Sequence, residues 1–354
     1  MNETKKHSLF TANLLFMILA YLFIIGSFVM GYLNVGFRWS IIIIQYVIIF
    51  IPILITMKVK GVSIRERFRF NPIKLSTGLK TIFITFAAIP IAYMLNLIVN
   101  IILMKLDLFT IQQMDLGNTT GAGNFFILTF LLALTPGICE EFFFRGMMLS
   151  AYRDKMSPTK AIIITGILFG LFHFNIQNLL LPSFLGIILA WLVYTTDSIY
   201  PSMIAHGTFN FVGSLLMTGN QEASTPEDME MALNMMDENG LQILFVFAIM
   251  SIFAGLIMFG LMYWLKSDYI SAKAGDSIVI KDVTMEITYV DFNGLKVIHN
   301  EEEKSISKKN LKKIQHKIHR VFESEPISPW NYWMVGMVIV LYVGFTILSF
   351  SNLG

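Results

Sequence analysis

Nine long apolar segments constrain the fold of this chain more than any other feature. They lie at residues 9–33, 39–57, 81–104, 125–151, 158–174, 179–196, 199–217, 241–265 and 330–350. About 20 consecutive apolar residues cross the hydrocarbon core of a bilayer as a helix, and these segments are continuously apolar rather than alternating. The sequence therefore predicts an all-α polytopic membrane protein with about nine transmembrane helices.

Composition narrows the class further. Hydrophobic residues make up 55% of the chain and charged residues 14%, whereas a soluble domain has about 25% charged residues. The net charge of +2 gives no reason to expect a nucleic-acid partner. The single cysteine, Cys139, excludes an intrachain disulfide and any metal or redox site built from a cysteine pair.

The charges of the loops predict the orientation of the helices, because loops rich in Lys and Arg stay in the cytoplasm. Residues 58–80 hold seven Lys and Arg residues against one acid, whereas residues 218–240 hold six acids and no Lys or Arg. We therefore expect a multi-pass protein of the cell membrane, with its N-terminus in the cytoplasm and its C-terminus outside.

A polar insert at 267–328 separates the last two apolar segments, and we expect it to be a small cytoplasmic α+β unit. Residues 287–292 and 295–298 resemble two strands joined by Asn293-Gly294, a pair typical of a hairpin turn. A helix is predicted after them, and it either covers the sheet or lies on the anionic inner leaflet. The insert is also a candidate site for a cytoplasmic partner. The apolar face of the predicted helix carries Leu311, Ile314, Ile318, Val321 and Phe322.

The fourth apolar segment contains three ionisable side chains, Glu140, Glu141 and Arg145. A charge inside a bilayer is costly, so such residues are functional candidates by default. Glu141 and Arg145 are four residues apart and can pair on one helical face, whereas Glu140 points about 100° away from Glu141. Glu140 is therefore left to find a partner on another helix.

Two other segments offer such partners. The fifth segment ends in His173, and the seventh contains His206 and Asn210, whose spacing of four residues places them on one face. Counted at about 1.5 Å per residue, Glu140 and His173 lie past the middle of the membrane and His206 lies nearer the cytoplasm. These residues meet only if the helices tilt, break near Pro136 or Pro201, or begin elsewhere than predicted.

The three motifs together resemble those of the CAAX-prenyl-protease-2-like intramembrane proteases, the CPBP or Abi family. They are Glu140-Glu141-x-x-x-Arg145, Phe169-x-x-x-His173 and His206-x-x-x-Asn210, in this order on successive segments. The resemblance covers residues 124–216, about a quarter of the chain. It implies an endopeptidase that hydrolyses a peptide bond of a membrane-associated peptide or protein tail.

The resemblance also implies a role for each residue. Glu140 would activate the attacking water, and His173 would share or orient that water. His206 and Asn210 would stabilise the oxyanion, and Glu141 and Arg145 would support the site as a pair.

The sequence leaves the cofactor open. Glu140, His173 and His206 are one carboxylate and two imidazoles, which can form a catalytic zinc site with an open position. The glutamate mechanism needs no metal, and the motif His-Glu-x-x-His of soluble zinc proteases is absent.

Two functions of other classes also stay open. A membrane immunity or regulatory protein on the same scaffold would act by contact, without catalysis, and the cytoplasmic insert favours it. A proton-coupled transporter would use Glu140 and the histidines as a relay, but the chain lacks the internal repeats of such transporters.

The expected domain organisation follows from these assignments. Residues 1–123 form a three-span region, and residues 124–217 form the catalytic core. Residues 218–266 form an acidic external loop and the eighth span, residues 267–328 the insert, and residues 329–354 the ninth span. The expected partners are the lipid bilayer and a peptide or membrane-protein substrate.

Overall fold

A computed structural model of the chain describes residues 9–61, 64–110, 121–220, 226–269, 277–280, 283–290, 294–299, 302–307, 318–319 and 332–351. The chain divides into two compact units. The first unit comprises Met1–Met258 and Pro326–Gly354, and the second comprises Phe259–Glu325.

The first unit is helical. Each of the nine predicted segments falls on a helix or on a run of helices joined end to end. The elements are α1 (Leu9–Tyr32), α2 (Phe37–Ile42), η1 (Ile43–Phe50), α3 (Ile51–Lys60), α4 (Ile64–Arg67), α5 (Leu75–Lys105), α6 (Ala122–Thr129), η2 (Phe130–Leu134), α7 (Thr135–Glu141), η3 (Phe142–Met148), α8 (Leu149–Arg153), α9 (Pro158–Leu171), η4 (Ile176–Asn178), α10 (Leu180–Thr196), α11 (Tyr200–Asn220), α12 (Pro226–Ser267) and α14 (Trp333–Ser351).

Six helices in the described part of the chain are long and apolar enough to cross a membrane. They are Leu9–Tyr32, Phe37–Lys60, Leu75–Lys105, Ala122–Arg153, Asn234–Ser267 and Trp333–Phe350. The protein is therefore a multi-pass membrane protein. The fifth, sixth and seventh predicted spans correspond to α9, α10 and α11, which are shorter or less apolar, and the total of nine stays a prediction.

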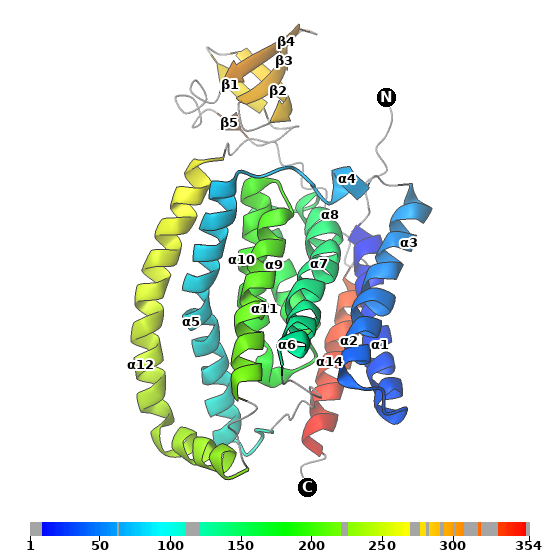
Figure 1. Cartoon of the computed structure of the whole chain (residues 1–354). Helices are drawn as coiled ribbons and strands as arrows, with labels where there is room; N and C mark the ends of the chain where they lie inside the picture. Colours follow the sequence, from blue (N-terminus) through cyan, green and yellow to red (C-terminus); the bar gives the residue numbers. More distant parts are fainter. Residues whose placement is uncertain are drawn as a thin grey trace. The chain divides into compact units, whose positions relative to one another are not determined.

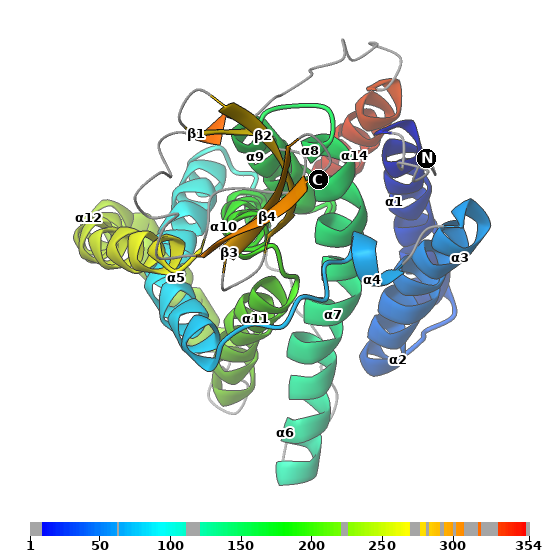
Figure 2. The same cartoon turned by 90° about the horizontal axis from the view of Figure 1, so that it is seen from above.

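The helix α7 lies between two groups of helices (Figure 1). On one side are α1, α2 and α3, and on the other side is α11, with α5 and α12 beyond it. The view along the helices in Figure 2 shows the same order. The segment that carries Glu140 is thus enclosed by helices from both ends of the chain.

Two prolines follow segments of π-helix. Pro52 stands at the start of α3, directly after η1, and Pro136 stands at the start of α7, directly after η2. Proline has no N–H to donate to the carbonyl four residues earlier and its ring crowds that carbonyl, so the turn before it widens. Such π turns are frequent at functional sites. The break expected near Pro136 is therefore a widened turn within a continuous helix.

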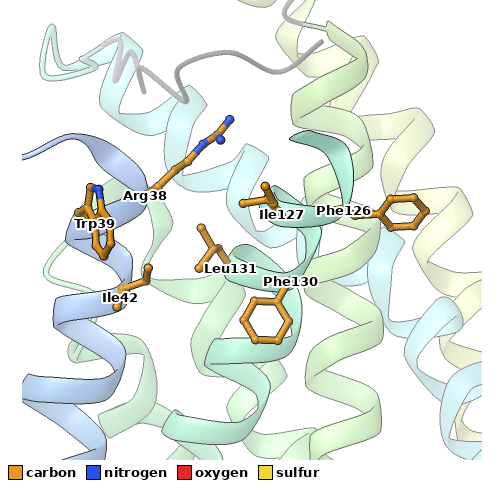
Figure 3. Close-up of a pocket in the computed structure, with 7 residues that line it drawn as sticks. All are labelled: Arg38, Trp39, Ile42, Phe126, Ile127, Phe130 and Leu131. Atoms are coloured by element: carbon orange, nitrogen blue, oxygen red, sulfur yellow. The ribbon is translucent and has the colours of Figure 1, made fainter. Parts of the chain in front are cut away.

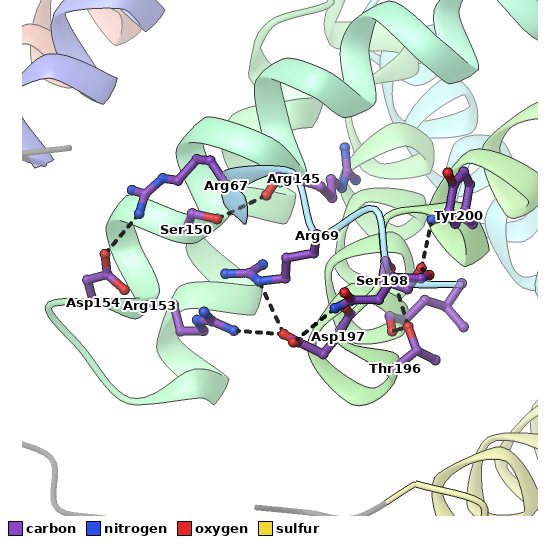
Figure 4. Close-up of polar contacts among 12 residues, drawn as sticks. Arg67, Arg69, Arg145, Ser150, Arg153, Asp154, Thr196, Asp197, Ser198 and Tyr200 are labelled. Atoms are coloured by element: carbon purple, nitrogen blue, oxygen red, sulfur yellow. Dashed lines mark hydrogen bonds and ion pairs between the residues drawn. The ribbon is translucent and has the colours of Figure 1, made fainter. Parts of the chain in front are cut away.

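Polar contacts connect the loops of the helical unit into two separate groups, and ion pairs hold the first group. Arg67 lies 3.3 Å from Asp154, and Asp197 lies 3.2 Å from Arg69 and 3.5 Å from Arg153 (Figure 4). This set connects the loops that precede α5, α9 and α11, which the charge pattern predicts to be cytoplasmic.

A second set of contacts joins the loops that the charge pattern predicts to lie outside. Arg38 donates to Asn124, Lys105 pairs with Asp237, and Gln177 contacts Thr110. The loop after α9 belongs to this set, and the loop after α10 belongs to the first set. Each of these two short helices therefore runs from one set of loops to the other. Which set faces the cytoplasm stays a prediction.

The second unit contains a five-stranded antiparallel sheet in the order β4-β3-β2-β1-β5. The buried side chains of Ile287 and Val297 face each other across β2 and β3. The strands are β1 (Ser277–Ile280), β2 (Val283–Val290), β3 (Gly294–His299), β4 (Glu302–Ser307) and β5 (Ile318–His319).

The predicted pairing of the two strands is confirmed, because β2 pairs with β3. The predicted two-residue turn Asn293-Gly294 is wrong, because it would place Phe292 opposite Leu295, whereas Leu295 pairs with Val290 and Gly294 already belongs to β3. Residues 291–293 lie outside the described residues. The helix predicted after the sheet is wrong at Ile318, which forms β5 and pairs with Ile278. A helical period read from isolated apolar residues does not detect an edge strand of two residues. The other residues of that predicted helix, Leu311, Ile314, Val321 and Phe322, lie outside the described part.

Candidate active site

The close approach of α7 and α11 brings the predicted site residues together. A Cβ atom added to Gly137 would lie 3.2 Å from the backbone nitrogen of Gly207. Glycine at both positions allows the two backbones to approach, as is common between membrane helices. The contact places Glu140 and Glu141, one turn after Gly137, beside His206, which directly precedes Gly207.

Glu141 is a fully buried carboxylate with two cationic or polar partners. Its Oε1 atom lies 2.9 Å from Nη1 of Arg145 and 2.9 Å from Nδ1 of His206. Arg145 also donates to the carbonyl of Gly186 on α10, at 3.1 Å. The predicted pair of Glu141 and Arg145 is therefore present. Through His206, Glu141 also connects α7 to α11, and through Gly186, Arg145 connects η3 to α10.

Glu140 faces a different set of partners, as its angle to Glu141 requires. Its Oε1 accepts a hydrogen bond of 2.7 Å from Nε2 of Gln45, and its Oε2 lies 3.9 Å from Nε2 of His206. The residue is only 8% exposed. His206 thus stands between the two carboxylates, with one ring nitrogen toward each.

The ring of Phe169 supports three of these groups at once. The guanidinium of Arg145 lies 4.7 Å from the ring centroid, in the position of a cation over an aromatic face. The rings of His173 and His206 stand edge-on to Phe169, with centroids 5.0 and 5.5 Å away. The first residue of the motif Phe169-x-x-x-His173 therefore packs between the histidines and the arginine.

His173 lies in the turn that ends α9. Its Nδ1 atom donates to the carbonyl of Phe169 at 2.8 Å, which leaves Nε2 as the acceptor of the neutral ring. The next residue, Phe174, has a φ of 47°, a left-handed conformation that is uncommon for a residue other than glycine. The turn thereby fixes the direction of the imidazole without a hydrogen bond to Glu140.

Asn210 lies one turn beyond His206 on α11, as its spacing predicts. The residue is half-buried, and its side chain makes no hydrogen bond to any residue that the structure describes. Asn210 therefore belongs to the candidate site by its place on α11 and not by a contact of its side chain.

The depths counted from the sequence differ from the observed arrangement, in which Glu140 and His206 are neighbours. The π turns of η3 lie between Glu141 and the end of its helix at Arg153. A π turn holds more residues per unit length than an α turn, so a count at the α-helical rise places Glu140 too deep.

The candidate metal ligands do not fit a metal site in the described residues. No group of three His, Cys, Asp or Glu side chains there is arranged to hold an ion. We therefore derive no step through a metal.

Sequence reasoning missed Gln45, which contacts Glu140 from a helix 95 residues earlier in the chain. The sequence does contain an indication of this contact, because Gln45 is an amide within the apolar run 41–50. A buried amide in such a run needs a hydrogen-bond partner, so it marks a helix contact even though it does not identify the partner.

An apolar cavity of about 530 Å³ lies beside this site, between α2 and the start of the helix that carries Glu140 (Figure 3). Ile42, at its wall, is three residues from Gln45, while no predicted site residue lines the cavity. Its lining consists of Arg38, Trp39, Ile42, Phe126, Ile127, Phe130 and Leu131.

Comparison with known proteins matches this part of the chain to one family. Residues 122–212 match the family model described as type II CAAX prenyl endopeptidase Rce1-like. No curated protein and no solved structure shows a match to the chain. The matched residues include all three motifs, the helix α7 and the part of α11 that meets it at Gly137. The segment that carries the candidate site thus matches the Rce1-like family model, within a longer multi-pass membrane protein.

Proposed function

We propose that the protein is an intramembrane endopeptidase that hydrolyses a peptide bond of a membrane-associated peptide or protein tail. The observation that carries this proposal is the position of His206 between two carboxylates. Glu141 holds one ring nitrogen at 2.9 Å, and Glu140 faces the other at 3.9 Å. A buried carboxylate beside an oriented imidazole is suited to proton transfer.

In the proposed mechanism, Glu140 acts as the general base. Its Oε2 atom takes a proton from a water molecule while the water oxygen attacks the carbonyl carbon of the scissile bond. The neutral Nε2 of His173 accepts the second hydrogen of this water and so orients it. Glu140 then returns its proton to the leaving amine, and the bond between carbon and nitrogen breaks.

His206 and Asn210 stabilise the oxyanion in this proposal. Glu141 accepts a hydrogen bond from Nδ1–H of His206, and in the proposed reaction the ring also carries a proton on Nε2, so that Nε2–H can donate to the developing oxyanion. The amide of Asn210, one turn away, supplies a second donor. Donors that are fixed before the reaction stabilise this charge most strongly. Glu141 and Arg145 support the site, because their pairing holds His206 in place.

The mechanism requires no metal, and we propose that none takes part. The protein would act in the cell membrane with its N-terminus in the cytoplasm and its C-terminus outside. Its substrate would reach Glu140 within the bilayer.

The test compares membranes from cells with the wild-type protein and with Glu140→Gln. Proteomics of these membranes should find a peptide or protein that accumulates uncut only with the variant. The purified full-length protein in liposomes should then cleave that substrate, and Glu140→Gln and His173→Ala should each lower the rate by about 10²–10⁴-fold. Cys139→Ala is the matched control, since this buried neighbour of Glu140 has no role in the mechanism. Full cleavage by a folded Glu140→Gln variant would refute the proposal.

A contact-acting regulatory protein predicts the opposite pattern. Its cellular effect would survive Glu140→Gln and disappear when residues 267–328 are deleted. The observation that favours this alternative is the presence of a second compact unit, Phe259–Glu325, which could bind a partner.

A further inference from the structure

Gln45 contributes to the candidate site from outside the segment that matches the Rce1-like family model, residues 122–212. It is 7% exposed, and its Nε2–H donates to Oε1 of Glu140 at 2.7 Å. This is a charge-assisted hydrogen bond when Glu140 is ionised, and such bonds are shorter and stronger than neutral ones.

The π segment η1 places Gln45 at this point. The segment spans Ile43–Phe50 and ends at the turn that precedes Pro52. At its far end, the ring of Phe50 packs against Phe142 at a centroid distance of 5.1 Å. Two contacts therefore fix η1 against the helix of Glu140, one polar and one aromatic, and they hold the amide in register with the carboxylate.

We infer that Gln45 is a positioning residue for Glu140, an inference that rests on the proposed peptidase function. The amide N–H holds one carboxylate oxygen, and the other oxygen is thereby left facing Nε2 of His206. The hydrogen bond limits the rotation of the carboxylate, and the free Oε2 atom is the one that takes a proton from water in the proposed mechanism.

The same side chain can serve the protonated form of Glu140. The carbonyl oxygen of Gln45 is buried and has no hydrogen-bond partner among the described residues. A half-turn of the amide exchanges its oxygen and nitrogen, so that the oxygen accepts the O–H of Glu140 once the carboxyl has taken a proton. An amide can thus hold both states of the base in the catalytic cycle, whereas an apolar side chain can hold neither.

The experiment compares Gln45→Leu and Gln45→Met with Tyr46→Phe, a control on the neighbouring residue of the same segment. All are full-length proteins in liposomes, and thermal denaturation checks that they fold. We expect kcat to fall about tenfold or more in both Gln45 variants, with KM within twofold of wild type, because the lost hydrogen bond acts on the base and not on substrate binding. Tyr46→Phe should keep both values.

A second measurement needs no turnover. It compares the denaturation temperatures of Gln45→Leu, Glu140→Leu and the double variant Gln45→Leu/Glu140→Leu. Because each single substitution already removes the hydrogen bond, the double variant should shift the temperature by less than the sum of the two single shifts. Additive shifts in folded proteins would overturn the inference. If the wild-type protein shows no Glu140-dependent hydrolysis, the proposed function fails, and this comparison still decides whether Gln45 holds Glu140.

Discussion

The Nδ1 atom of His206 lies 2.9 Å from Oε1 of Glu141, and this carboxylate oxygen is also the partner of Arg145. An ionised carboxylate only accepts, so the Nδ1 atom must carry a proton. The other nitrogen, Nε2, is then directed toward Glu140. One buried oxygen thereby sets both the tautomer and the orientation of the histidine.

Substitution of Glu141 should separate the effects of this oxygen on folding and on catalysis. In Glu141→Gln the guanidinium of Arg145 stays buried without a counter-charge, which should lower the free energy of unfolding by about 3–5 kcal/mol. The double variant Glu141→Gln/Arg145→Met should recover part of this loss, because no unpaired charge remains.

Both variants should lose hydrolysis by about 10²-fold or more, since His206 no longer has a carboxylate to hold its tautomer. Denaturation curves and cleavage rates in liposomes measure the two effects. A folded double variant with the wild-type rate would show that Glu141 has no role in orienting His206.

The packing of α7 on α11 gives a second prediction, at Gly137. The side chain of Gly137→Val would meet the backbone of Gly207 and the carbonyl of Met203, so the two helices must move apart. Glu140 and His206 would separate with them, and the cleavage rate should fall about tenfold or more, as expected for a displacement near the reacting groups.

Gly213→Val is the matched control for this variant. Gly213 lies on the same helix as Gly207, and a Cβ atom added there meets nothing within 4 Å. Equal effects of the two substitutions on the rate would contradict the importance of the close approach.

The local parts of this site were predictable from the sequence, and the distant parts were not. The pairing of Glu141 with Arg145 follows from a spacing of four residues on one helix. The contact of His206 with Glu141 joins residues 65 positions apart, and that of Gln45 with Glu140 joins residues 95 apart. Such contacts depend on which helices are neighbours, and apolar periodicity carries no information on that when every helix is apolar.

The same reasoning applies to the fold. The pairing of β2 and β3 was visible because the two strands are adjacent in sequence. Strand β5 was missed because its partner, β1, lies about 40 residues earlier and β5 has only two residues. The π segments were not predicted either, although Pro52 and Pro136 mark the ends of the widened turns of η1 and η2.

The ion pairs of Asp197 give a prediction about stability (Figure 4). Burial first, and then the charge of Arg153, lower the pKa of Arg69 to about 9, whereas Asp197 raises it. Because the unfolded chain keeps this proton at pH values where the folded protein releases it, stability should rise as the pH increases above about 9. At pH 7 the cost of burying the charge of Arg69 is fully present, and Asp197 offsets part of it.

Asp197→Asn should therefore lower the free energy of unfolding at pH 7, by about 1 kcal/mol because water screens its half-exposed carboxylate. Asparagine tolerates the positive φ of 49° at this position, so the substitution does not strain the backbone. Asp237→Asn is the control, because both partners of its pair with Lys105 are exposed and the pair should contribute about 0.5 kcal/mol or less. Denaturation of both variants in detergent measures the difference, and an equal loss in the two would contradict the role of the buried partner Arg69.

Removal of metal ions should leave hydrolysis unchanged. No three candidate ligands within the described residues are arranged to hold an ion. A zinc peptidase needs three protein ligands and a bound water, and it loses activity when a chelator removes the ion.

We therefore expect the cleavage rate in liposomes to stay within twofold after treatment with 1,10-phenanthroline. A soluble zinc peptidase in the same buffer serves as the control and should lose its activity. If the chelator abolishes cleavage and added Zn²⁺ restores it, Glu140 acts with a metal rather than as a base supported by Gln45 and His206.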